Sequence, residues 1–106
     1  MEKYFKSYKD LLNFDFSKLE PEKSNYLTLI PVNGILPRLK LGSSLKNWKW
    51  VNVEYDQART PEIFFEISPK WLTTTIIKPT GECRRRVDFE LNQKDPKSII
   101  QELFEE

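Results

Sequence analysis

The sequence predicts an α+β fold in which an antiparallel meander sheet of about six strands is packed against an N-terminal and a C-terminal helix. Three observations support this prediction. The stretch 71–91 has the pattern of a β-hairpin, further β-like stretches precede it, and apolar residues recur at helical spacing near both ends. Short connections between consecutive strands favour a meander, and a strongly curled sheet or partial barrel is the competing arrangement.

The N-terminal stretch 2–13 is expected to form the first helix. Tyr4, Tyr8 and Leu11 recur there at helical spacing and define an apolar stripe. A polar segment that contains Pro21 follows and ends the pattern.

A second hairpin is expected over 26–41. The dipeptide Asn33-Gly34 lies there between two apolar stretches, which is the strongest short-range hairpin signal. Each stretch also contains a proline, which lacks a backbone N–H. These strands should therefore be short, bulged or at an edge of the sheet.

The next strand is expected at 48–55. If its side chains alternate regularly, Val51 and Val53 lie on one face, and Trp48 and Trp50 lie on the other. The apolar pair suits a core, so the two indoles should face away from it. The alternative is that a helix or a second layer covers both indoles.

The strand at 62–68 alternates in the same way. Ile63 and Phe65 fall on one face, and Phe64 and Glu66 fall on the other. A face with apolar residues beside a face with mixed residues is typical of a sheet that is packed on one side only.

The central hairpin joins strands at 71–78 and 83–91. The first strand is rich in β-branched and aromatic residues, and the second alternates so that Val87 and Phe89 share an apolar face. The segment between them contains Pro79 and Gly81, which are suited to a tight turn.

The C-terminal helix should begin with Asp95 as its N-cap and Pro96 as its first residue. One core is then expected to collect residues from several strands and from this helix. They are Val51, Val53, Phe65, Val87, Phe89, Ile99 and Leu103.

Composition limits the possible functions. With 106 residues, the chain is expected to form one domain, 1–106. It has 17 basic and 16 acidic residues, so bulk charge alone cannot hold it on nucleic acid. It has no histidine and a single cysteine, Cys83, which disfavours zinc binding and catalysis that needs an imidazole. We therefore expect no enzyme activity, no cofactor, no metal and no membrane span, and a cytoplasmic location.

The densest basic feature is the run 84–86. In a strand, Arg84 and Arg86 share one face and are spaced to bind phosphates or carboxylates. The alternative is that they pair across strands with acidic residues such as Glu54 or Glu66, an ordinary arrangement in sheets.

A second basic feature surrounds the two tryptophans. The stretch 25–53 has no acidic residue and contains four basic ones, namely Arg38, Lys40, Lys46 and Lys49. Basic residues that alternate with aromatic ones are typical of single-stranded nucleic-acid binding. The stretch has none of the sequence motifs of the common RNA-binding modules.

These observations lead to a non-enzymatic binding module that acts through a protein partner, as an adaptor, inhibitor or assembly factor. The partner is expected to bind the face with Trp48, Trp50 and Phe64, with Arg84 and Arg86 at its rim. The alternative is a single-stranded nucleic-acid-binding protein that uses the same face together with the four basic residues of 25–53. A small-ligand carrier with a pocket inside a curled sheet is a third hypothesis.

Overall fold

The computed structural model describes residues 1–39, 49–54, 61–77, 84–92 and 94–104, and for residues 49–54, 77 and 84–87 it describes the backbone only. The described chain forms helices and strands in the following order: β1 (Glu2–Phe5), α1 (Tyr8–Asn13), the 3-10 helix η1 (Phe16–Lys18), β2 (Asn25–Leu29), β3 (Lys49–Glu54), β4 (Glu62–Ile67), β5 (Trp71–Ile77), β6 (Arg84–Glu90) and α2 (Pro96–Leu103).

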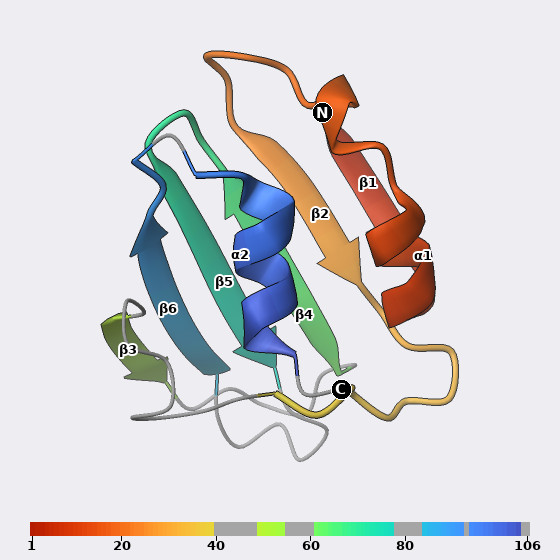
Figure 1. Ribbon diagram of the computed structural model, residues 1–106. Helices are drawn as coiled ribbons and strands as arrows, with labels where there is room; N and C mark the ends of the chain where they lie inside the picture. The colour runs from red at the N-terminus through yellow and green to blue at the C-terminus, as the bar shows by residue number, and fades with distance from the viewer. Residues whose placement is uncertain (40–48, 55–60, 78–83, 93, 105–106) are drawn as a thin grey trace.

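The strands form one open, mixed sheet with α1 and α2 on the same side of it (Figure 1). Its body consists of β1, β2, β4, β5 and β6, and β3 pairs along the outer edge of β6. The α+β class is confirmed. The purely antiparallel meander is wrong, because β1 pairs with β2 in parallel and the strand order is not the chain order. The described strands do not close into a barrel.

The N-terminus departs from the predicted helix over 2–13. Residues Glu2–Phe5 form β1, and the helix begins only at Tyr8. Ser7 is its N-cap, with a side-chain oxygen that accepts a hydrogen bond from the Asp10 N–H at 3.1 Å. Two parallel neighbours need a long connection that crosses the sheet, and here α1 and η1 lie on that connection between β1 and β2.

The hairpin predicted over 26–41 is wrong. β2 ends at Leu29 and pairs with β1 and β4, and no strand occurs in the described residues 30–39. The turn signal itself is real, because Gly34 has a φ of 71° and its N–H donates to the carbonyl of Pro31 at 3.1 Å. The prolines explain why no ladder follows the turn. Leu39 instead forms an isolated bridge with Phe104 at the end of α2.

The two strands of the central hairpin and the strand before them are confirmed, while the predicted turn with Pro79 and Gly81 lies outside the described residues. β4 pairs with β5 and β5 pairs with β6, both antiparallel, with Leu72 opposite Phe89. Alternation along β4 also agrees with the prediction, since Ile63 and Phe65 are buried and Phe64 and Glu66 are half-buried. These strands are correct because neighbouring segments along the chain pair with one another.

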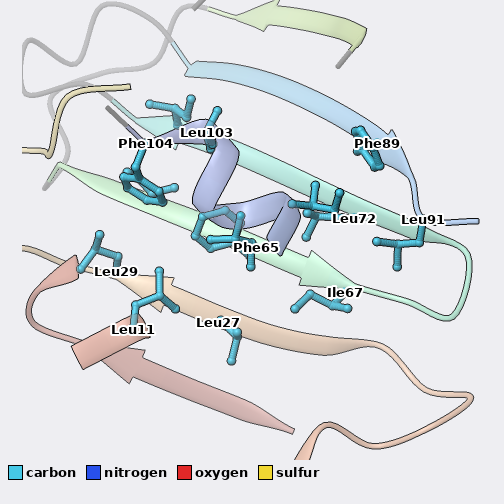
Figure 2. Close-up of a cluster of buried hydrophobic side chains, with 14 residues drawn as sticks. Leu11, Leu27, Leu29, Phe65, Ile67, Leu72, Phe89, Leu91, Leu103 and Phe104 are labelled. Carbon is cyan, nitrogen blue, oxygen red and sulfur yellow. The ribbon is translucent and has the colours of Figure 1, made fainter. Parts of the chain in front are cut away.

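The core lies between the sheet and the two helices (Figure 2). Four residues of the predicted core are buried in it, namely Phe65, Phe89, Ile99 and Leu103. The side chains of the other three, Val51, Val53 and Val87, lie outside the described part of the structure. The predicted start of α2 is confirmed, because the Asp95 side chain accepts a hydrogen bond from the Lys97 N–H at 3.2 Å. α2 thereby presents Ile99, Ile100 and Leu103 to the sheet.

Candidate functional site: the open face of the sheet

The two faces of the sheet have different surroundings. One face packs against α1 and α2, which lie on the same side in Figure 1. We call the other the open face, since neither helix lies on it. Strand pairing and alternation give its members among the residues with described side chains. They are Glu2, Tyr4, Tyr26, Thr28, Glu62, Phe64, Glu66, Trp71, Thr73, Thr75, Asp88 and Glu90.

Aromatic side chains occupy the part of the open face on β1, β2 and β4. The rings of Tyr26 and Phe64 are stacked, with their centroids 5.8 Å apart and their planes at 21°. Tyr4, on β1, has 63% of its surface exposed, and Trp71, at the start of β5, has 47% exposed. Large aromatic side chains on one uncovered sheet face form a surface suited to binding, because part of their apolar area stays in contact with water.

Carboxylates lie on both sides of Tyr26. In the register of the sheet, Tyr26 is opposite Glu2 on β1 and opposite Glu66 on β4. Neighbouring strands are roughly 4.8 Å apart, so Glu2 and Glu66 are the nearest cross-strand neighbours of Tyr26 on this face. The Glu66 carboxylate forms no ion pair with any side chain that the structure describes. The position therefore combines an aromatic surface with negative charge.

The negative charge changes the acidity of Tyr4. Its hydroxyl donates a hydrogen bond to Oε1 of Glu2 at 2.7 Å. This hydrogen bond and the charge of the Glu2 carboxylate raise the pKa of the Tyr4 hydroxyl, with a smaller contribution from the charge of Glu62. The phenol is held in its neutral form because the phenolate would face like charges.

The structure brings only part of the predicted binding surface together. Phe64 lies on the open face, as expected from alternation along β4. Arg38 is exposed but lies beside Leu39, which pairs with the end of α2, so it is not on the open face. Three other predicted residues, Trp48, Lys40 and Lys46, lie outside the described residues.

For the remaining predicted residues the structure gives the backbone register. Arg84 is opposite Glu54 and Arg86 is opposite Asn52, while Lys49 is opposite Asp88. The pairing of Arg84 with Glu54 is the arrangement expected from ordinary cross-strand charge pairing. Glu66 has Thr73 as its partner on β5, so it is opposite neither arginine.

The position of Trp50 depends on an irregularity in β3. Trp50 is opposite Val87, and the register then shifts so that Asn52 is opposite Arg86, the next residue back along β6. Neighbouring residues of a strand belong to opposite faces. Regular alternation, which assigned Trp50 and Asn52 to one face, is therefore interrupted at this point. The role of Trp50 stays a prediction.

Strand order separates two acidic residues of the sheet. Two carboxylates that are neighbours on one face can act as a hydrolase pair, so the distance between Glu54 and Glu66 matters. β5 and β6 lie between their strands, which separates the two backbones by about 14 Å. The backbone register therefore gives no support to a glycosidase-type carboxylate pair at these two positions.

Two clefts that described residues line lie away from the open face. The larger, of about 580 Å³, is next to the start of α1 and is lined by Tyr8, Leu29, Leu36 and other residues of 6–10 and 31–37. The smaller, of about 240 Å³, lies among the loops at the start of β2 and the end of β4. Neither is the pocket inside a curled sheet that the small-ligand hypothesis requires.

The sequence interpretation missed most of the open face. Tyr4 was assigned to a helix, and Tyr26 to a hairpin that does not form. One signal in the sequence could have located β1. Ser7 is followed three residues later by Asp10, a pattern that predicts the start of a helix at Ser7. The residues before Ser7 are then outside the helix and can form a strand.

Comparison with known proteins gives no relative from which a role could be transferred. No protein-family model, no curated protein and no solved structure matches the chain. Among the described residues, no helix is both long enough and apolar enough to cross a membrane. The function must therefore be inferred from the open face itself.

Proposed function

We propose that this protein is a non-enzymatic binding module that acts through a protein partner, as an adaptor, inhibitor or assembly factor, and that the partner binds the open face. The observation that carries the proposal is the stacked pair Tyr26 and Phe64 on a sheet face that neither helix covers. Aromatic residues are the usual anchors of protein interfaces, since they bury a large apolar area at low entropic cost.

The arrangement of the sheet supports this proposal further. The open face presents side chains of five strands, and their backbones are held in place by continuous pairing from β1 to β6. A rigid surface loses little conformational entropy when a partner binds. The proposed setting is the cytoplasm, which is supported by a sequence with a single cysteine.

The charges of the open face disfavour nucleic acid as the ligand. Its described side chains include five carboxylates, those of Glu2, Glu62, Glu66, Asp88 and Glu90. The register positions of Arg84, Arg86 and Lys49 belong to the same face, but they lie at least two strands away from Phe64. Nucleic-acid binding needs cations at the phosphates, and carboxylates at the same surface repel the backbone. The aromatic stack is therefore better suited to a protein.

Affinity capture from cell extract, with and without nuclease treatment, tests the proposal. Three tagged forms are compared: the wild type, Phe64→Ala, and Glu102→Ala on the exposed side of α2. We expect the wild type and Glu102→Ala to retain the same protein and Phe64→Ala to lose it, with all three forms folded by circular dichroism. Equal retention by Phe64→Ala would contradict the proposal, and retention that nuclease abolishes would favour the nucleic-acid alternative.

Trp48 and Trp50 belong to the same proposal. The double variant Trp48→Ala with Trp50→Ala is expected to lose the partner while its melting temperature stays nearly unchanged. Unfolding of the double variant would instead assign both indoles to a core.

A further inference from the structure

The part of the proposed partner surface around Tyr26 differs in charge from the whole chain. The protein carries a formal net charge of +1. On the open face, every charged side chain that the structure describes is a carboxylate, while Lys49, Arg84 and Arg86 occupy register positions of the same face on β3 and β6. An attraction for cations at this surface would therefore be local and could not arise from the overall charge.

The most defined position on this surface is Tyr26. Its ring is stacked on Phe64, and it lies between Glu2 and Glu66 in the register of the sheet. Glu2 already accepts a hydrogen bond from Tyr4, whereas Glu66 has no ion-pair partner among the described side chains. A group that fits here must offer a flat face to a ring and hydrogen-bond donors to a carboxylate.

Among protein side chains, the arginine guanidinium meets both requirements. It is planar and stacks on aromatic rings, and its N–H groups bind a carboxylate through two parallel hydrogen bonds. The lysine ammonium carries the same charge but is a compact, strongly hydrated group without a flat face. An acidic side chain or a phosphate would be repelled by Glu2 and Glu66.

We propose that the open face binds a protein segment through an arginine side chain that stacks on the Tyr26–Phe64 pair and forms an ion pair with Glu66. This inference rests on the proposed function, and it adds the chemistry of the partner. The Glu2 carboxylate, which raises the pKa of Tyr4, lies beside Tyr26 in the register and adds negative charge at this position.

The test uses the full chain, labelled with ¹⁵N, and three short synthetic peptides of equal length. Serine alternates with arginine in the first peptide, with lysine in the second and with glutamate in the third. We expect the arginine peptide to shift the amide signals of Tyr26, Glu66 and Thr73, and to bind several-fold more tightly than the lysine peptide. The glutamate peptide should leave these signals unchanged.

Matched variants locate the ion pair. Glu66→Gln keeps the size of the side chain and removes its charge, and it should weaken binding of the arginine peptide about tenfold. Glu102→Gln makes the same change on the exposed side of α2 and should leave binding unchanged. Thermal melting of both variants checks that the fold is intact.

Three results would overturn this inference. The arginine peptide does not bind, its binding shifts only signals of residues away from the open face, or Glu66→Gln binds it as tightly as the wild type. If the glutamate peptide binds the open face instead, the arginine is wrong while the proposed protein-binding role survives. The protein-binding role is tested separately, and it is wrong if Phe64→Ala still retains the partner from cell extract.

Discussion

The two faces of β4 show how one strand separates stability from recognition. Ile63, Phe65 and Ile67 are buried against α1, α2 and the core, with at most 3% of their surface exposed. Phe64 and Glu66, their direct neighbours in sequence, lie on the open face and are half-buried. Alternation makes this separation possible, because each substitution affects only one face.

The covered face should account for most of the stability. Its buried cluster includes side chains of both helices and of β2, β4, β5 and β6. The open face should contribute less, since its aromatic side chains keep more of their area in water than the buried side chains of the covered face do. The comparison predicts large losses of stability from one face and losses of binding from the other.

The largest effect is expected at the contact between α2 and the sheet. Leu103→Ala should lower the free energy of unfolding by about 2–5 kcal/mol, because Leu103 is fully buried and its removal leaves a cavity. Urea denaturation measures the loss. Glu102→Ala, one residue earlier and exposed, should change stability by less than about 0.5 kcal/mol. Equal losses would mean that α2 does not pack as described.

A smaller effect is expected at the start of the same helix. Asp95→Ala removes the side chain that accepts the Lys97 N–H and should lower the free energy of unfolding by about 1 kcal/mol. Asp95→Asn retains an acceptor oxygen and should recover most of the loss. If Asp95→Ala is as harmful as Leu103→Ala, the helix depends on its cap more than on packing against the covered face.

The smallest effect concerns the charge of the open face. Glu2→Gln should lower the pKa of the Tyr4 hydroxyl toward its ordinary value, since it removes a charged hydrogen-bond acceptor. Absorbance at alkaline pH, with the other tyrosines replaced by phenylalanine, follows this titration. A pKa that does not change would show that the Glu2 carboxylate is not the main cause.

The raised pKa of the Tyr4 hydroxyl also predicts the direction in which the free energy of unfolding changes with pH. Because the pKa of Tyr4 is raised in the folded protein, folding favours the protonated phenol. This contribution is fully present below the pKa of the unfolded chain and is lost as the pH rises through the folded pKa. The free energy of unfolding should therefore fall at alkaline pH, and less so in Glu2→Gln.

Local patterns predicted part of this fold correctly. The β5–β6 hairpin and the start of α2 were found because their signals lie within a few residues: alternation, turn residues, and the Asp95-Pro96 pair. β1 was missed because Glu2–Phe5 becomes a strand only by pairing with β2, which begins about twenty residues later. The pairing itself has no local signal over this sequence separation, and only the helix start at Ser7 marks where a preceding strand has to end.

The candidate site was harder to predict than the fold. Phe64 could be placed by alternation within its own strand. Its stacking partner Tyr26 could not, because that contact depends on β2 pairing with β4 across the intervening residues. Which face stays open also depends on where both helices pack, and alternation alone does not determine this.

The most direct test compares two phenylalanines that are adjacent in β4. Phe65→Ala should lower the free energy of unfolding by about 3–5 kcal/mol, since its side chain fills the covered core. Phe64→Ala should lower it by only about 1 kcal/mol, which reflects its stacking on Tyr26. Urea unfolding of both variants under identical conditions gives the two values. A loss for Phe64→Ala as large as that for Phe65→Ala would contradict the account, because the open face would then be part of a core.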